Sequence, residues 1–154
     1  MKNKILLLGL TIFLLPLVSL AQQGDFGLGV IVGEPTGLSW KIWSRGTTAI
    51  AGAAAWSFGG RDAFHLHADY LFHHFRFFTV SKGRLPFYYG LGVRFLFHEE
   101  GEDRTRVGVR LPLGIEYIFA GPPLSLFMEI VPILDLAPGT DFDLNGAVGI
   151  RFYF

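Results

Sequence analysis

Apolar and polar side chains alternate along most of this chain. The pattern is clearest in its final stretch, from Phe142 to Phe154. A period of two is typical of a β-strand with one apolar face, so we predict that the protein ends on such a strand. One face of it carries Phe142, Leu144, Val148, Ile150, Phe152 and Phe154, and the other carries Asp143, Asn145, Ala147, Gly149, Arg151 and Tyr153.

Seven further segments show similar alternation, and turn-forming residues separate them, as at Glu34–Gly37 and Ala137–Asp141. Pro112 and Pro132 lie inside predicted strands. Because proline donates no backbone hydrogen bond, we expect a bulge or a rim position at each. The stretch 75–84 fits either neighbouring strand. The pattern predicts an all-β fold of eight antiparallel strands with short connections, over residues 25–33, 38–44, 47–58, 63–73, 85–98, 104–119, 124–135 and 142–154.

The two faces of these strands differ in bulk. One carries Phe, Leu, Tyr or Trp on nearly every strand, whereas the other mixes charges with glycines such as Gly29 and Gly92. An eight-stranded barrel has an interior only just wide enough for side chains, and small beside large residues fill it. A water-facing exterior would carry many Lys and Glu instead. We therefore predict a closed up-and-down transmembrane β-barrel with its bulky face toward lipid.

Composition supports a membrane protein without helical spans. Charged residues are only 17% of the chain and phenylalanines number 16, yet no apolar run after residue 21 approaches the ~20 residues of a membrane helix. Lys2 and Lys4 precede an apolar run, and Ser19-Leu20-Ala21 is a small-x-small cleavage pattern. We predict a cleaved signal peptide over residues 1–21 and a single barrel domain over 22–154.

The inward face is expected to hold equal numbers of both charges. Charges excluded from bulk water must be paired, so this balance predicts a hydrogen-bonded plug that fills and orders the barrel. A selective conduit or proton path is the alternative. The predicted lumen network is Lys41, Arg94, Arg106, Arg110 and Arg151 with Asp69, Glu116, Glu129, Asp135 and Asp143.

His65, His67 and Asp69 alternate on one strand and form a weak candidate metal site. Three protein ligands plus water resemble a catalytic zinc site. However, all three lie on one strand, their ends are ~13 Å apart at strand rise, and no fourth ligand is evident. We predict no metal and no cofactor. The chain carries 13 basic and 13 acidic residues, so it lacks the net basic surface that nucleic acid requires.

The ending Gly149-Ile-Arg-Phe-Tyr-Phe154 resembles the C-terminal assembly signal of bacterial outer-membrane barrels, with Gly149, Phe152 and Phe154 as its key positions. The chain from residue 22 resembles a small eight-stranded barrel of the OmpA-transmembrane or OmpX type. The stretches Gly33–Lys41 and His67–His73 are similar to an uncharacterised family of predicted small outer-membrane barrels.

The resemblance implies a monomer in outer-membrane lipid, folded by the barrel assembly machinery. An even number of strands brings both mature termini to the same end, which in outer-membrane barrels is the periplasmic side. Barrels that resemble the lipid A deacylases carry a His and a Ser two positions apart, but here the matching positions read His65-Leu66-His67. We therefore predict no enzyme, and a structural or surface-exposed membrane component. The alternatives are a narrow channel, or a module that binds an extracellular protein ligand through Glu34–Gly37, Glu99–Asp103 and Ala137–Asp141.

Overall fold

The protein folds into one closed β-sheet in a computed structural model that describes residues 24–57, 63–98 and 105–154. The predicted signal peptide and the predicted rim loop Glu99–Asp103 lie outside these residues. No helix within the described ranges is long and apolar enough to cross a membrane. The strands are β1 (Phe26–Gly33), β2 (Thr36–Arg45), β3 (Thr48–Ser57), β4 (Ala63–His74), β5 (Phe87–His98), β6 (Thr105–Arg110), β7 (Leu113–Ile118), β8 (Leu124–Ala137) and β9 (Asp141–Tyr153).

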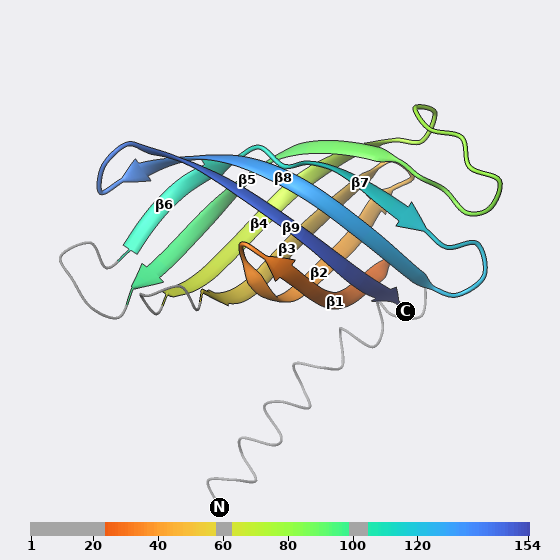
Figure 1. Cartoon of the computed structure of the whole chain (residues 1–154), viewed down its shortest axis with the longest axis horizontal. Helices are drawn as coiled ribbons and strands as arrows, with labels where there is room; N and C mark the ends of the chain where they lie inside the picture. Colours follow the sequence, from red (N-terminus) through yellow and green to blue (C-terminus); the bar gives the residue numbers. More distant parts are fainter. Residues whose placement is uncertain (1–23, 58–62, 99–104) are drawn as a thin grey trace, which may run out of the picture.

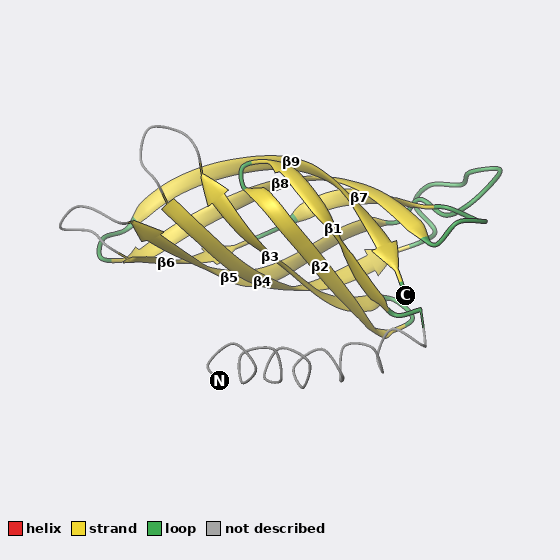
Figure 2. Cartoon of the chain, turned by 90° about the horizontal axis from the view of Figure 1, so that it is seen from below, coloured by secondary structure: helices red, strands yellow, loops and turns green. Residues whose placement is uncertain are grey.

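Every pairing is antiparallel, and β1 pairs with β9 to close the ring (Figures 1 and 2). Both β6 and β7 lie between β5 and β8. They share one register: Arg110 faces Ile133 and Leu113 faces Ile130 across the gap. β6 and β7 therefore form one wall strand, and the predicted barrel of eight antiparallel strands is confirmed.

The prediction of a bulge or rim position at Pro112 and Pro132 is wrong. Gly90 N–H donates to the Pro112 carbonyl and Leu111 N–H donates to the Pro132 carbonyl, both at 3.0 Å. Pro132 also faces Leu144 in an unbroken β8–β9 register. Each proline lacks a donor but keeps its acceptor, so the register continues past both without a shift, although Leu111 and Pro112 form the break between β6 and β7. The register shifts lie elsewhere, at Trp43/Arg45 and Val107/Gly108.

Two connections differ from the prediction. The β1–β2 connection is only Glu34 and Pro35, because Thr36 and Gly37 already belong to β2. There the Thr36 hydroxyl accepts from Gly33 N–H at 3.0 Å and donates to the Gly33 carbonyl at 2.9 Å. By contrast, residues 75–86 form a long connection between β4 and β5, so the expectation that every connection is short is wrong.

The barrel has two distinct ends, which we name from the connections that they carry. The terminal end carries the start of β1, the end of β9 and the 75–86 connection (Figure 1). Phe154 N–H donates to the Phe26 carbonyl there at 2.9 Å. The loop end carries the β1–β2 and β8–β9 connections. An even number of wall strands brings the start of β1 and the end of β9 to the same end.

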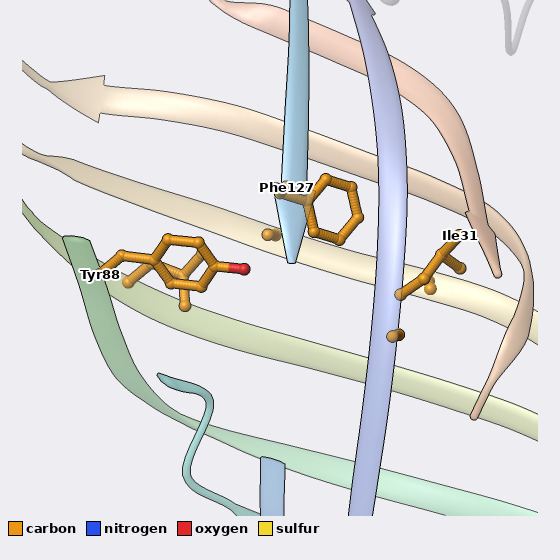
Figure 3. Close-up of a cluster of buried hydrophobic side chains, with 7 residues drawn as sticks. Ile31, Tyr88 and Phe127 are labelled. Carbon is orange, nitrogen blue, oxygen red and sulfur yellow. The ribbon is translucent and has the colours of Figure 1, made fainter. Parts of the chain in front are cut away.

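The bulky faces point outward, as predicted. Large apolar side chains such as Val30, Leu91 and Met128 are exposed on the outer wall, whereas charged side chains are buried inside. The interior also holds an apolar cluster, of which Figure 3 labels Ile31, Tyr88 and Phe127. Alanines of β3 belong to this cluster, so the small inward side chains of one strand accompany the large ones of others.

Candidate functional site

The candidate site is the polar interior, which forms three layers along the barrel. The layer nearest the terminal end is built around Glu116 of β7, which is fully buried. Its carboxylate forms an ion pair with Lys41 of β2 and accepts hydrogen bonds from the hydroxyls of Ser125 (2.6 Å) and Tyr153 (3.0 Å). Arg151 Nη1 lies 3.7 Å from the same carboxylate. Side chains from three other wall strands, β2, β8 and β9, therefore converge on Glu116.

The middle layer is built around Arg110 of β6, also fully buried. Arg110 Nε donates to Asp69 Oδ1 at 2.8 Å, and its Nη2 lies 3.5 Å from Glu129 Oε1. The Tyr88 hydroxyl donates to the other Glu129 oxygen at 2.8 Å. One cation thus bridges carboxylates from β4 and β8 across the lumen.

The layer nearest the loop end is built around Arg94 of β5. Its guanidinium holds Asp135 through two hydrogen bonds, from Nη2 at 2.7 Å and from Nε at 3.1 Å. Its Nη1 donates to Asp143 Oδ2 at 3.1 Å. Arg106 is more exposed, and its Nη1 lies 3.9 Å from Asp135 and from Asp141. A bidentate arginine–carboxylate contact fixes the orientation of both side chains as well as pairing their charges. The Arg94–Asp135 pair therefore has the most closely defined geometry in this layer.

All ten predicted network residues therefore lie in these layers, each within ion-pair distance of an opposite charge. Parity along the strands was enough to place them inside. Neutral partners were missed, although Tyr88, Ser125 and Tyr153 occupy inward positions by the same parity. Asp141 was missed because the predicted last strand began one residue later, at Phe142.

Two further inward contacts also went unpredicted. His73 Nε2 lies 2.8 Å from Lys41 Nζ, and Ser39 Oγ accepts from Arg151 Nε at 3.0 Å. Both cations also contact aromatic rings: Lys41 Nζ lies 4.1 Å from the Trp43 ring centre, and the Arg151 guanidinium carbon lies 3.8 Å from that of Phe127. The two cations of the terminal-end layer are therefore satisfied on several sides.

Glycines on neighbouring strands make room for the large inward side chains. A Cβ added to Gly92 would collide with the Asp69 carboxylate, and one added to Gly149 would collide with the Phe127 ring. The same holds for two other directly opposed pairs. The four cross-strand pairs are Asp69–Gly92, Tyr88–Gly114, Asp135–Gly108 and Phe127–Gly149.

The candidate metal residues are engaged with each other and with the network. His67 Nδ1 lies 3.2 Å from His65 Nε2, His67 Nε2 lies 3.7 Å from Asp69 Oδ2, and Asp69 accepts from Arg110. Within the residues that the structure describes, no group of three His, Cys, Asp or Glu side chains is arranged to hold a metal ion. These three side chains therefore belong to the polar network around Arg110.

The residues of the predicted assembly signal divide between the two faces of β9. Gly149 lies inside, opposite Phe127. Phe152 and Phe154 are exposed on the outer wall, with ring centres 5.0 Å apart. Their role in assembly stays a prediction.

No protein-family model and no curated protein matches the sequence. Among solved structures, the N-terminal β-barrel domain of Pseudomonas aeruginosa OprF matches with a TM-score of 0.59 at 14% identity, covering 84% of this chain and 95% of that one. Neisserial surface protein A (NspA) matches with a TM-score of 0.48 at 13% identity, covering 84% and 93%. The first likeness, together with the closed ring described above, shows that this chain has the fold of the small OmpA-like eight-stranded barrels.

Proposed function

We propose that this protein is a monomeric integral barrel of a bacterial outer membrane, with a closed interior and a structural or surface-exposed role. The outward apolar wall supports the membrane assignment, because in lipid only helices and closed barrels satisfy all backbone hydrogen bonds. The predicted signal peptide and the phenylalanine-rich ending support export and outer-membrane assembly.

The observation that carries the closed interior is the three-layer network. Arg110 and Glu116 are fully buried, and each contacts side chains from other wall strands. An open conduit needs a continuous water-filled path, but here charged and aromatic side chains meet across the lumen at three levels. The polar groups therefore act as packing that orders the barrel, in preference to a selective channel.

Planar-bilayer recording tests the closed interior. We expect no steady conductance from the wild-type protein, because each layer blocks the lumen. The matched comparison is the double variant Asp69→Ala with Arg110→Ala, which removes one charge of each sign from the middle layer and keeps the net charge. It should also show no steady conductance, because the other two layers still block the lumen. Steady, charge-selective conductance by the wild-type protein would contradict the closed interior and favour a channel.

Single-cysteine labelling tests the location and the direction of insertion. The chain contains no cysteine, so one introduced thiol gives an unambiguous signal. Arg45→Cys places it at the terminal end and Thr140→Cys places it at the loop end, and both positions are exposed. On intact cells, a membrane-impermeant maleimide is expected to label the Thr140→Cys variant. The Arg45→Cys variant should be labelled only after the outer membrane is permeabilised. The reverse pattern would contradict periplasmic termini.

A further inference from the structure

The long 75–86 connection is rich in basic and aromatic residues. It carries Arg76, Lys82 and Arg84 and has no acidic residue, and it includes two adjacent phenylalanines, Phe77 and Phe78. Phe77 is 72% exposed. The lumen network uses none of these side chains, and the connection lies at the terminal end of the barrel (Figure 1).

Backbone contacts hold the connection in place. Arg84 and Ile118 exchange two backbone hydrogen bonds, at 2.9 and 2.8 Å, and the Tyr117 hydroxyl donates to the Lys82 carbonyl at 2.9 Å. Gly83 between them has a φ of +74°, a conformation that glycine adopts at no steric cost. Lys82 and Arg84 are therefore presented from a fixed backbone.

The phenylalanines join an aromatic cluster on the outer wall. The Phe77 ring centre lies 5.9 Å from that of Phe87 and 6.2 Å from that of Phe78. The cluster continues along the wall through His74 and Tyr89, whose ring centres are 5.4 Å apart. Aromatic side chains are enriched where a barrel wall meets the membrane–water interface, and this cluster borders the apolar outer wall.

The cations of the 75–86 connection form no ion pair within the described part of the chain. No carboxylate among the described residues lies within ion-pair distance of Arg76, Lys82 or Arg84. Arg84 faces away from the cluster: it lies over the Phe75 ring, 4.9 Å from its centre, and lines a separate hollow at the mouth of the lumen with Asp25, Trp43 and Tyr153. Arg76 lines an open hollow of about 570 Å³, together with Thr47, His73, His74, Phe75 and Phe77. The surface thus offers positive charge next to exposed aromatic area.

We propose that the 75–86 connection binds an anionic phospholipid of the leaflet at the terminal end. Arg76 and Lys82 bind the phosphate-bearing headgroup, and the Phe77–Phe78–Phe87 cluster packs against the acyl chains. Charge complementarity and the continuity of the cluster with the apolar wall identify this occupant, because a soluble anion would leave the aromatic surface uncovered. The inference rests on the proposed function, in that it requires the barrel to lie in a bilayer.

Lipid enrichment around the reconstituted barrel tests this proposal. The wild-type protein is placed in nanodiscs of phosphatidylcholine containing a minority of phosphatidylglycerol, and the lipids retained after mild detergent extraction are measured by mass spectrometry. The neutralised variant is Arg76→Ser with Lys82→Ser, which leaves the backbone contacts intact. The charge-preserving control is Arg76→Lys with Lys82→Arg.

We expect wild type and control to retain phosphatidylglycerol above its bulk fraction. The preference of the neutralised variant for phosphatidylglycerol over phosphatidylcholine should be at least ~10-fold weaker, since each cation near an anionic surface contributes roughly fivefold. Equal enrichment in wild type and neutralised variant would overturn the lipid site. Displacement of the lipid by millimolar glycerol phosphate would also overturn it, in favour of a soluble anion. A protein that never enters nanodiscs would instead overturn the proposed membrane function.

Discussion

Replacing Glu116 with alanine is expected to lower the free energy of unfolding by roughly 3–5 kcal/mol, the usual cost of leaving a buried charge without its partner. The substitution removes the counter-ion of Lys41, which is fully buried, and the carboxylate 3.7 Å from Arg151 Nη1. It also removes the acceptor for the Ser125 and Tyr153 hydroxyls. The change is measured by denaturant unfolding of the barrel folded into phospholipid vesicles, followed by tryptophan fluorescence.

Two comparisons make this experiment specific. Glu34→Ala, at an exposed site in the β1–β2 connection, should change stability by less than about 0.5 kcal/mol. The double variant Lys41→Met with Glu116→Leu should be less destabilised than Glu116→Ala, because it leaves no unpaired Lys41 ammonium inside the barrel. An unchanged unfolding midpoint in Glu116→Ala would show that the network does not order the barrel.

Replacing Val148 with arginine is expected to cost ~2–4 kcal/mol, or to prevent membrane insertion, because arginine at the middle of a barrel's lipid face is destabilising by this amount. Val148 lies outward on β9, between Val32 of β1 and Met128 of β8, and it is 51% exposed. Refolding yield into vesicles and the unfolding free energy both report the effect.

The same substitution near the strand end supplies the control. Phe142 also points outward on β9 but lies beside the loop end. There Phe142→Arg should cost only ~0–1 kcal/mol, since the penalty falls toward the membrane interface. Equal costs at both positions would contradict a membrane-embedded wall, and a full yield with native stability for Val148→Arg would show that this face does not meet lipid.

Much of the fold could be predicted from the alternation alone. A strand places successive side chains on opposite faces, so the inward positions of Lys41, Arg110 and Glu116 follow from counting along each strand. The outward direction of the bulky face follows from volume, because eight strands cannot enclose so many large side chains. Neither inference needs to know which strands are neighbours.

The prolines and the long connection could not be predicted in the same way. Whether a strand tolerates Pro112 depends on the residue opposite it. That residue, Gly90, lies on another strand, where it donates its N–H to the Pro112 carbonyl. The conformation of residues 75–86 depends on hydrogen bonds with Tyr117 and Ile118, which lie more than thirty residues further along the chain. Local composition reveals neither contact.

The fold class, the division of each strand into an outer and an inner face, and the inward placement of charges of both signs all follow from the sequence. These properties depend on the two-residue period of a strand and on side-chain volume, which are local or additive. Which of these charges meet depends on the closed ring of strands. Glu116 has Lys41, Ser125 and Tyr153 as partners because ring closure and register bring β2, β8 and β9 to one level. Such pairing is a property of the closed barrel, in which distances across the lumen are set by all its strands together.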